Sequence, residues 1–133
     1  HGGNFVRTMA RLAGERDTVR VVDDQHGNPT WTHDLADGLI ALVLAAERVH
    51  PGVLHCVNAG STTWCGLARA VFAEIGADPE RVQPCTTAEF PRPAPRPANS
   101  MLDTTCWSAA GLAALRPWRE ALSAAVAAGV LAG

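Results

Sequence analysis

The sequence predicts an α/β domain, with a small mixed sheet of short strands and about five helices. Apolar residues recur at helical spacing in several long segments, and short β-branched segments lie between them. Clusters of glycine, proline, asparagine and aspartate separate these segments. The 133 residues suit one domain over 1–133, and a hydrophobic content of 47% is enough for a packed core without disulfides.

The first fifty residues contain two predicted helices and one predicted strand. Asn4 is a suitable N-cap for a helix that Gly14 can end. The β-branched segment 18–22 predicts a short strand, and the turn-rich segment 23–32 follows it. A second helix is predicted over 33–48, with an apolar stripe that should be buried. The stripe consists of Leu35, Ala36, Leu39, Ile40, Leu42, Val43 and Ala46.

The middle of the chain contains two further predicted strands and the helix with the clearest period. Residues 53–58 (VLHCVN) predict a second strand after a Pro-Gly turn, and residues 82–86 predict a third. Between them, a helix that Gly76 ends is predicted from its apolar spacing. The apolar residues are Trp64, Leu67, Ala68, Val71, Phe72 and Ile75.

The last third of the chain is rich in proline. Segment 84–99 holds five prolines and is predicted to be extended, because each proline lacks a donor and restricts its predecessor. Met101 and Leu102 are predicted to be buried, and Asp103 is a suitable cap for a short helix. Pro117 suits the first turn of a last helix.

Composition and charge exclude several classes of protein. The formal net charge of −2 and the pI of about 6.2 argue against a general nucleic-acid binder. No apolar run approaches the roughly 18 residues of a membrane span, and no signal peptide is visible, so we expect a cytoplasmic protein. The four cysteines lack the spacing of a zinc site and are expected to be reduced, small apolar side chains.

The chain contains neither lysine nor tyrosine, so all eleven of its Lys and Arg cations are arginines. Its chemistry therefore cannot use a tyrosine acid or a lysine base. We predict no catalytic residue within the chain.

The first candidate binding segment follows the predicted strand 18–22 and contains Gln25, Pro29 and Thr30. Crevices at the carboxyl ends of strands are the usual ligand sites of α/β sheets. Gln25 offers both a donor and an acceptor to a sugar hydroxyl or a base edge. The alternative interpretation is a structural turn.

The second candidate is Arg96, together with Asn99 and Ser100. A guanidinium held in a stiff, proline-rich segment matches the geometry of a phosphate, and the two neutral side chains add donors. The alternative interpretation is a surface arginine on a loop.

Two weaker candidates remain. Asn4 follows two glycines at a predicted helix start, where free N–H groups favour an anion, although an ordinary N-cap explains it equally well. His33, Asp34 and Asp37 resemble a metal cluster but are more typical of the exposed first turn of a helix. We therefore predict no metal site.

Three motifs in order carry a resemblance to a known family: GGNFVRTM at 2–9, VVDDQHGNPTWTHDLADGL at 21–39 and RPANSMLD at 96–103. Together they resemble the C-terminal part of dTDP-4-dehydrorhamnose reductases, which are extended short-chain dehydrogenases. The resemblance covers nearly the whole chain. It implies a fragment of a longer protein, whose N-terminal Rossmann domain with the glycine-rich loop and the catalytic threonine, tyrosine and lysine is absent.

The resemblance implies a function for this half. Family members reduce the C4 ketone of a dTDP-4-keto sugar with NADPH or NADH to give dTDP-L-rhamnose, and the missing domain would bind that cofactor. The chain would bind and orient the dTDP-sugar. It implies that Asn4 lies near the nucleotide and that Arg96 meets the diphosphate. It also implies that the segment holding Gln25, Pro29 and Thr30 faces the sugar nucleotide, with Asn99 and Ser100 in the same motif as Arg96.

The remaining expectations concern partners. Some family members are described as magnesium-dependent dimers, so the resemblance adds Mg²⁺ and a homo-oligomer to the possibilities. An alternative is a non-catalytic module, because the regulatory subunit of methionine adenosyltransferase resembles the same family. A second alternative is a proline-rich ligand at 92–97. A lone half is expected to expose an apolar face where the Rossmann domain would sit.

Overall fold

The computed structural model describes residues 3–50, 52–91 and 93–131, and all statements below refer to these. The predicted α/β class with about five helices is confirmed. The helices are α1 (Phe5–Glu15), α2 (Thr32–Leu44), α3 (Trp64–Glu74), α4 (Thr105–Ala109) and α5 (Trp118–Ala127). The strands are β1 (Val19–Val22), β2 (His26–Gly27), β3 (Asn58–Ala59), β4 (Thr62–Thr63), β5 (Val82–Cys85) and β6 (Leu115–Pro117). Single 3-10 turns occur at Ala46–Arg48 and Pro79–Arg81.

The strands form three separate pairs, whereas the sequence predicted one small mixed sheet. β1 and β5 are parallel, with Val19 opposite Val82 and Val22 opposite Cys85. β2 pairs antiparallel with β4, and β3 pairs parallel with β6. The strands are only two to four residues long, so each forms a ladder with one partner before the chain turns away.

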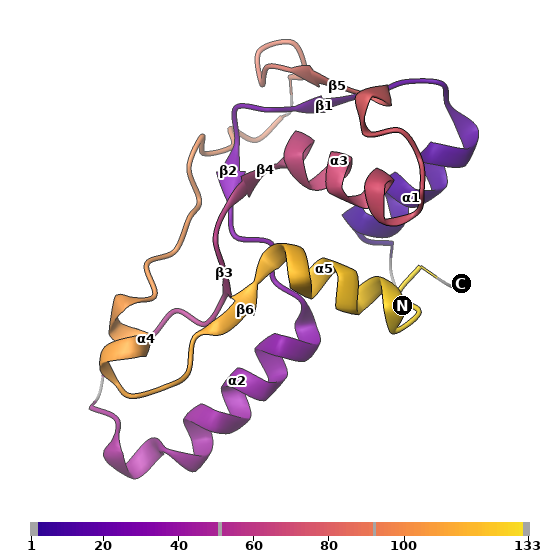
Figure 1. Cartoon of the computed structure of the whole chain (residues 1–133). Coiled ribbons are helices and arrows are strands. Elements are labelled where there is room, and N and C mark those ends of the chain that lie inside the picture. The colour runs from indigo at the N-terminus through magenta and orange to yellow at the C-terminus, as the bar shows by residue number, and fades with distance from the viewer. Residues whose placement is uncertain (1–2, 51, 92, 132–133) are drawn as a thin grey trace.

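The main core lies where α1 and α3 pack beside the β1–β5 ladder, in the upper part of Figure 1. The predicted periodicity of α3 is confirmed, and Val71 and Phe72 are fully buried. Gly76 ends this helix with φ +73°, a backbone conformation that a side chain would disfavour. The last helix contributes Leu122 to this core. Asn4 caps α1 as predicted, although this helix continues past Gly14 to Glu15.

The predicted burial of the α2 stripe is wrong. α2 projects away from the main core (Figure 1), and only Asp34 and Gly38 are buried along it. Four of its large apolar residues are exposed by 46 to 79%: Leu39, Ile40, Val43 and Leu44. The helix is apolar on more than one side, so its spacing could not tell which side would be covered.

The strand predicted over 53–58 forms only at its end, in β3. In the part of the chain that the structure describes, residues 53–56 form no backbone hydrogen bond. A strand-like sequence alone is insufficient, because a strand also needs a neighbour to pair with. We refer to residues 53–56 as the unpaired segment.

The proline-rich region is less extended than predicted. Pro84 lies in β5, and a turn follows in which the Glu89 N–H donates to the Thr86 carbonyl. Arg92, which begins the predicted proline-rich ligand, lies outside the described residues. Met101 and Leu102, predicted to be buried, are 45% and 43% exposed and lie in a stretch without regular secondary structure.

Two further elements lie close to where the sequence placed them, although Thr104 and not the predicted Asp103 is the N-cap residue of α4. Asp103 lies two residues before α4 and accepts a hydrogen bond from the Thr105 N–H at 2.8 Å, which satisfies one free donor at the helix start. Pro117 immediately precedes α5. Within the described part of the chain, no helix has the length and apolar character that a membrane span requires.

Candidate functional site

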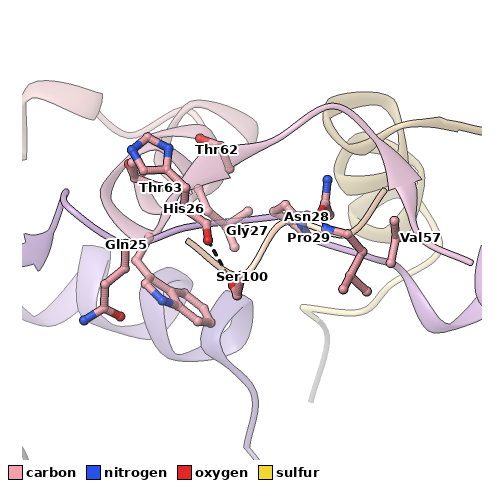
Figure 2. Close-up of a pocket in the computed structure, with 12 residues that line it drawn as sticks. Gln25, His26, Gly27, Asn28, Pro29, Val57, Thr62, Thr63 and Ser100 are labelled. Atoms are coloured by element: carbon pink, nitrogen blue, oxygen red, sulfur yellow. Dashed lines mark hydrogen bonds between the residues drawn. The ribbon is translucent and has the colours of Figure 1, made fainter. Parts of the chain in front are cut away.

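Two of the predicted binding segments lie side by side. His26 forms a parallel bridge with Asn99, and the His26 N–H donates to the Ala98 carbonyl at 2.8 Å. The Ser100 N–H and the Ser100 hydroxyl both donate to the His26 carbonyl at 2.9 Å, and Figure 2 shows the hydroxyl contact as a dashed line. The turn-rich segment after β1 and the end of the proline-rich segment therefore form one unit, although more than seventy residues separate them.

A cavity of about 200 Å³ opens on this unit (Figure 2). Three predicted site residues line it: Gln25, Pro29 and Ser100. Gly27 lies against the Ser100 hydroxyl so closely that a Cβ atom would approach the Ser100 oxygen to 3.0 Å. The backbone of this segment is thus packed tightly on its partner and forms a firm wall.

Gln25 is held in place by a chain of hydrogen bonds. It is 8% exposed, and its Nε2 donates to the Thr87 hydroxyl at 2.9 Å. Thr87 in turn donates to Asp24 from its hydroxyl at 2.6 Å and from its N–H at 2.8 Å. These bonds, chiefly the one from the Thr87 hydroxyl, hold the pKa of Asp24 below its ordinary value. The side chain of Gln25 is therefore fixed before any ligand arrives.

Arg96 lines a second cavity of about 460 Å³, which also contacts α1 and β1. Gln25 and Trp64 belong to both this cavity and the smaller one. Phe90 and Phe5 also line it, so part of its lining is apolar and aromatic. Among the described residues, no carboxylate forms an ion pair with Arg96. The guanidinium thus remains available to an anion.

Asn4 and Thr30 line a third cavity, of about 520 Å³, between the start of α1 and α5. The Asn4 Oδ1 accepts from the Arg7 N–H at 2.9 Å, so its capping role is confirmed while a ligand role stays a prediction. Thr30 donates to the Asn28 carbonyl at 3.1 Å. Pro29 lines this cavity as well as the smallest one, so the three cavities adjoin.

Asn99 lies in none of these cavities. Its Oδ1 accepts from the Met101 N–H at 2.9 Å, which stabilises a local turn. The structure therefore brings together Gln25, Pro29 and Ser100, places Arg96 next to Gln25, and gives Asn99 a structural contact.

Sequence reasoning missed two features of the site. From the sequence, Trp64 is only part of the apolar spacing of a helix, yet it is 39% exposed, lines two cavities and packs on Phe5 with ring centroids 4.7 Å apart. A tryptophan at a helix start, next to a turn, was the available signal. Asn58 was treated as the end of a strand, although it is fully buried among polar groups. A polar residue that directly follows an apolar run was the available signal there.

The residues that resembled a metal cluster do not converge. His33 Nδ1 lies 3.4 Å from the Asp37 carboxylate, and both side chains are 66% exposed. Asp34 turns inward and forms an ion pair with Arg116 at 2.8 Å. The charge of the Asp34 carboxylate is therefore already paired with Arg116, and this carboxylate is directed away from His33 and Asp37.

The cysteines are free thiols, as expected. Cys65 and Cys85 are buried, and desolvation raises the pKa of both thiols. They stay protonated at neutral pH and act as small apolar side chains. Cys106 is exposed, which the sequence did not indicate.

The chain matches a known family and several known proteins. The family model described as "RmlD substrate binding domain" matches residues 1–130. A dTDP-4-dehydrorhamnose reductase from Streptomyces griseus is 54% identical over 124 residues, which is 92% of this chain and 41% of that protein. A protein of the same name from Mycobacterium tuberculosis H37Rv is 52% identical over 127 residues, 96% of this chain and 41% of its own length.

Solved structures agree. A dTDP-4-dehydrorhamnose reductase from Clostridium acetobutylicum superposes with a TM-score of 0.88 at 36% identity, covering 97% of this chain and 45% of that one. A dTDP-4-dehydrorhamnose reductase from Bacillus anthracis, solved in complex with NADP, gives a TM-score of 0.85 at 33% identity, with 93% and 43% covered. The chain thus spans about two-fifths of the length of the curated relatives it matches.

Proposed function

Because the chain belongs to the family of RmlD substrate-binding domains, we propose that it binds a dTDP-linked 4-keto sugar and orients it for reduction at C4. The observation that carries this is the bridge between His26 and Asn99, which joins the two predicted binding segments beside one cavity. Ligand sites of α/β folds favour such junctions after a strand. The curated relatives named dTDP-4-dehydrorhamnose reductase support the substrate class.

Arg96 is proposed to bind the diphosphate. Its guanidinium has no carboxylate partner among the described residues, and its fork geometry suits two phosphate oxygens. The apolar and aromatic wall formed by Phe5, Trp64 and Phe90 in the same cavity suits the faces of a nucleobase. Gln25, which borders both cavities, would then meet the sugar or the base edge.

The reduction itself requires groups that this chain lacks. Its sequence contains no tyrosine or lysine that could protonate the developing alkoxide, and no GxGxxG loop leads from a strand into a helix. The residues present therefore do not fit NADPH or NADH, and the described residues contain no group of three or more His, Cys, Asp or Glu side chains that could hold Mg²⁺. In this proposal a Rossmann domain holds the nicotinamide cofactor, which supplies the hydride, and this chain supplies binding and orientation.

The surface proposed to meet that domain consists of the outer face of α2 and the unpaired segment. Gly38 faces inward, where a Cβ would approach the Cys56 sulfur to 2.6 Å. Leu39, Ile40 and Val43 lie toward the opposite side and are exposed. A helix with apolar residues on more than one side is normally buried, and strand-like backbone normally has a hydrogen-bonding neighbour. Both features are satisfied by a second domain that offers a strand and an apolar surface.

Calorimetry with dTDP tests the ligand proposal. It is carried out on this chain alone, and again after addition of the part of the Streptomyces griseus relative that this chain does not match. We expect binding that Arg96→Ala weakens by about tenfold or more, because a charge-assisted phosphate contact contributes about 1.5–3 kcal/mol. If dTDP binds neither to this chain alone nor to the two parts together, the proposal is contradicted. Association of the two parts without nucleotide binding would instead favour the regulatory-module interpretation.

Association of the same two parts tests the docking surface. Val43→Asp places a charge on the outer face of α2 and is expected to weaken association, whereas Ala73→Asp, at an exposed position of α3, is the matched control. Equal effects of the two substitutions would contradict the proposed surface. Without the second part, we expect this chain to self-associate in sedimentation experiments, and a monodisperse monomer would count against the uncovered face.

A further inference from the structure

A buried polar cluster joins α2, β3 and β6. Asp34 is 5% exposed and Asn58 is fully buried. The Arg116 guanidinium lies 2.8 Å from Asp34 Oδ1, and Asn58 Nδ2 donates to Asp34 Oδ2 at 2.8 Å. Burial of polar groups is costly unless every donor and acceptor has a partner.

Asn58 satisfies groups on three elements at once. Its Nδ2 also donates to the Arg116 carbonyl at 3.0 Å, which secures the β3–β6 pair. Its Oδ1 accepts from the Trp31 N–H at 2.9 Å, and its own N–H donates to the Thr30 hydroxyl at 3.3 Å. The segment Thr30–Trp31 is therefore held from two sides by one residue.

That segment forms one wall of the largest of the three cavities described above, together with Asn4 and Trp118. The start of α2 needs this help because its N-cap residue, Trp31, makes no side-chain capping bond. The indole of Trp31 is also constrained, since it stacks on His33 with ring centroids 4.9 Å apart and lies 5.7 Å below the Arg116 guanidinium.

From these contacts we infer that Asn58 is a positioning residue, which holds Thr30 and Trp31, and with them the adjoining Pro29 that also lines the smallest cavity, in the shape that receives the sugar nucleotide. The inference rests on the proposed function, since it names a residue that shapes the proposed site without touching the ligand. The position requires a donor and an acceptor in one short side chain, and asparagine supplies both. An aspartate would place a carboxylate oxygen against Asp34 and against a carbonyl, whereas leucine would leave the Trp31 N–H and Asp34 without their buried partner.

The test compares dTDP affinity, thermal unfolding and hydrogen exchange of the Trp31 amide in four proteins. These are the unaltered chain, the single variant Asn58→Asp, the double variant Asn58→Asp with Asp34→Asn, and the control Val71→Ala. Each is measured in the presence of the complementary part of the Streptomyces griseus relative. Val71 is fully buried in α3 and lines none of the three cavities, so its truncation lowers stability without altering the cluster.

We expect Asn58→Asp to weaken dTDP binding about tenfold or more and to accelerate exchange of the Trp31 amide. The double variant should recover part of both, because the amide introduced at position 34 can donate to the carboxylate introduced at position 58. Val71→Ala should bind dTDP within about twofold of the unaltered chain.

The inference is overturned if folded Asn58→Asp binds dTDP normally, or if Val71→Ala loses as much affinity. If the unaltered protein binds no dTDP, the proposed function fails, and unchanged Trp31 exchange in Asn58→Asp would show separately that Asn58 does not hold the segment.

Discussion

The helices α2 and α3 have similar apolar sequences and opposite surroundings. Both are about three turns long, yet α3 buries Leu67, Val71 and Phe72, whereas the large residues of α2 are largely exposed. α3 lies against α1, the β1–β5 ladder and α5, so most of its apolar residues after Trp64 are buried. α2 contacts mainly β6 and the turn that follows it. An apolar helix thus identifies a surface to be covered, and only the surrounding elements decide whether this chain covers it.

The two regions are also held together by different interactions. Around α3 the contacts are apolar and continuous, and Leu122 of α5 completes the cluster. Around α2 the contacts are the Asp34–Asn58–Arg116 cluster and the buried indole of Trp107, which lies near Gly38. Substitutions of the same kind should therefore have different consequences in the two regions.

The largest contrast is expected from Val71→Asp and Val43→Asp. Val71 is fully buried, so an unpaired charge there should lower the free energy of unfolding by about 3–5 kcal/mol. Val43 is 73% exposed, and the same substitution should change it by less than about 0.5 kcal/mol. Urea unfolding of each variant measures both values. Strong destabilisation by Val43→Asp would show that α2 is covered within this chain.

Replacing glycine by alanine should change the free energy of unfolding in opposite directions in α2 and α1. At Gly38 a new Cβ meets the Cys56 sulfur at 2.6 Å and Leu115 at 3.3 Å, so we expect a loss of about 1–3 kcal/mol from overpacking. Gly14 in α1 has no atom within 4 Å of such a Cβ, and alanine there should stabilise by up to about 1 kcal/mol because helix propensity improves. Thermal unfolding distinguishes the two. Stabilisation by Gly38→Ala would mean that α2 is not packed on Cys56.

A smaller effect is expected at the start of α1. Asn4→Ala removes the acceptor for the Arg7 N–H and should cost about 1 kcal/mol of stability, measured by chemical denaturation. Asn4→Ser keeps a capping oxygen and serves as the control. Equal losses of stability in Asn4→Ala and Asn4→Ser would show that the effect comes from changes in packing or in the ligand site and not from loss of the cap.

The smallest effect concerns acid titration. The pKa of Asp24 is lowered by Thr87, which joins the end of β1 to the turn after β5, and that of Asp103 is lowered by Thr105 beside it in α4. A lowered carboxyl pKa gives stability that is present above the ordinary value of 3.8 and is lost as the pH falls through the folded-state pKa. Thr87→Val should raise the pKa of Asp24 toward 3.8 and leave Asp103 unchanged, as followed by NMR titration. Thr105→Val is the reciprocal control, and an unaltered Asp24 titration in Thr87→Val would contradict the assignment.

Local signals predicted those elements whose cause is local. The cap at Asn4, the period of α3 with its stop at Gly76, and the strands β1 and β5 all follow from residue types close in sequence. The segment after β1 and Arg96, singled out from the sequence as candidate binding residues, line cavities in the structure, and their ligand role stays a prediction. Their partners, such as Thr87 for Gln25, lie about sixty residues away and leave no local trace.

The sequence by itself therefore determined the class, the helices, the family and the absence of a tyrosine or lysine for proton transfer. The tertiary structure alone decided which apolar faces are covered, since burial depends on neighbours that are distant in the chain. It also decided the pairing of the strands, because a short strand persists only where another backbone offers hydrogen bonds. The same reason applies to Asn58. Its amide group bonds to Trp31, Asp34 and Arg116, which are distant in the chain and come together only in the folded structure.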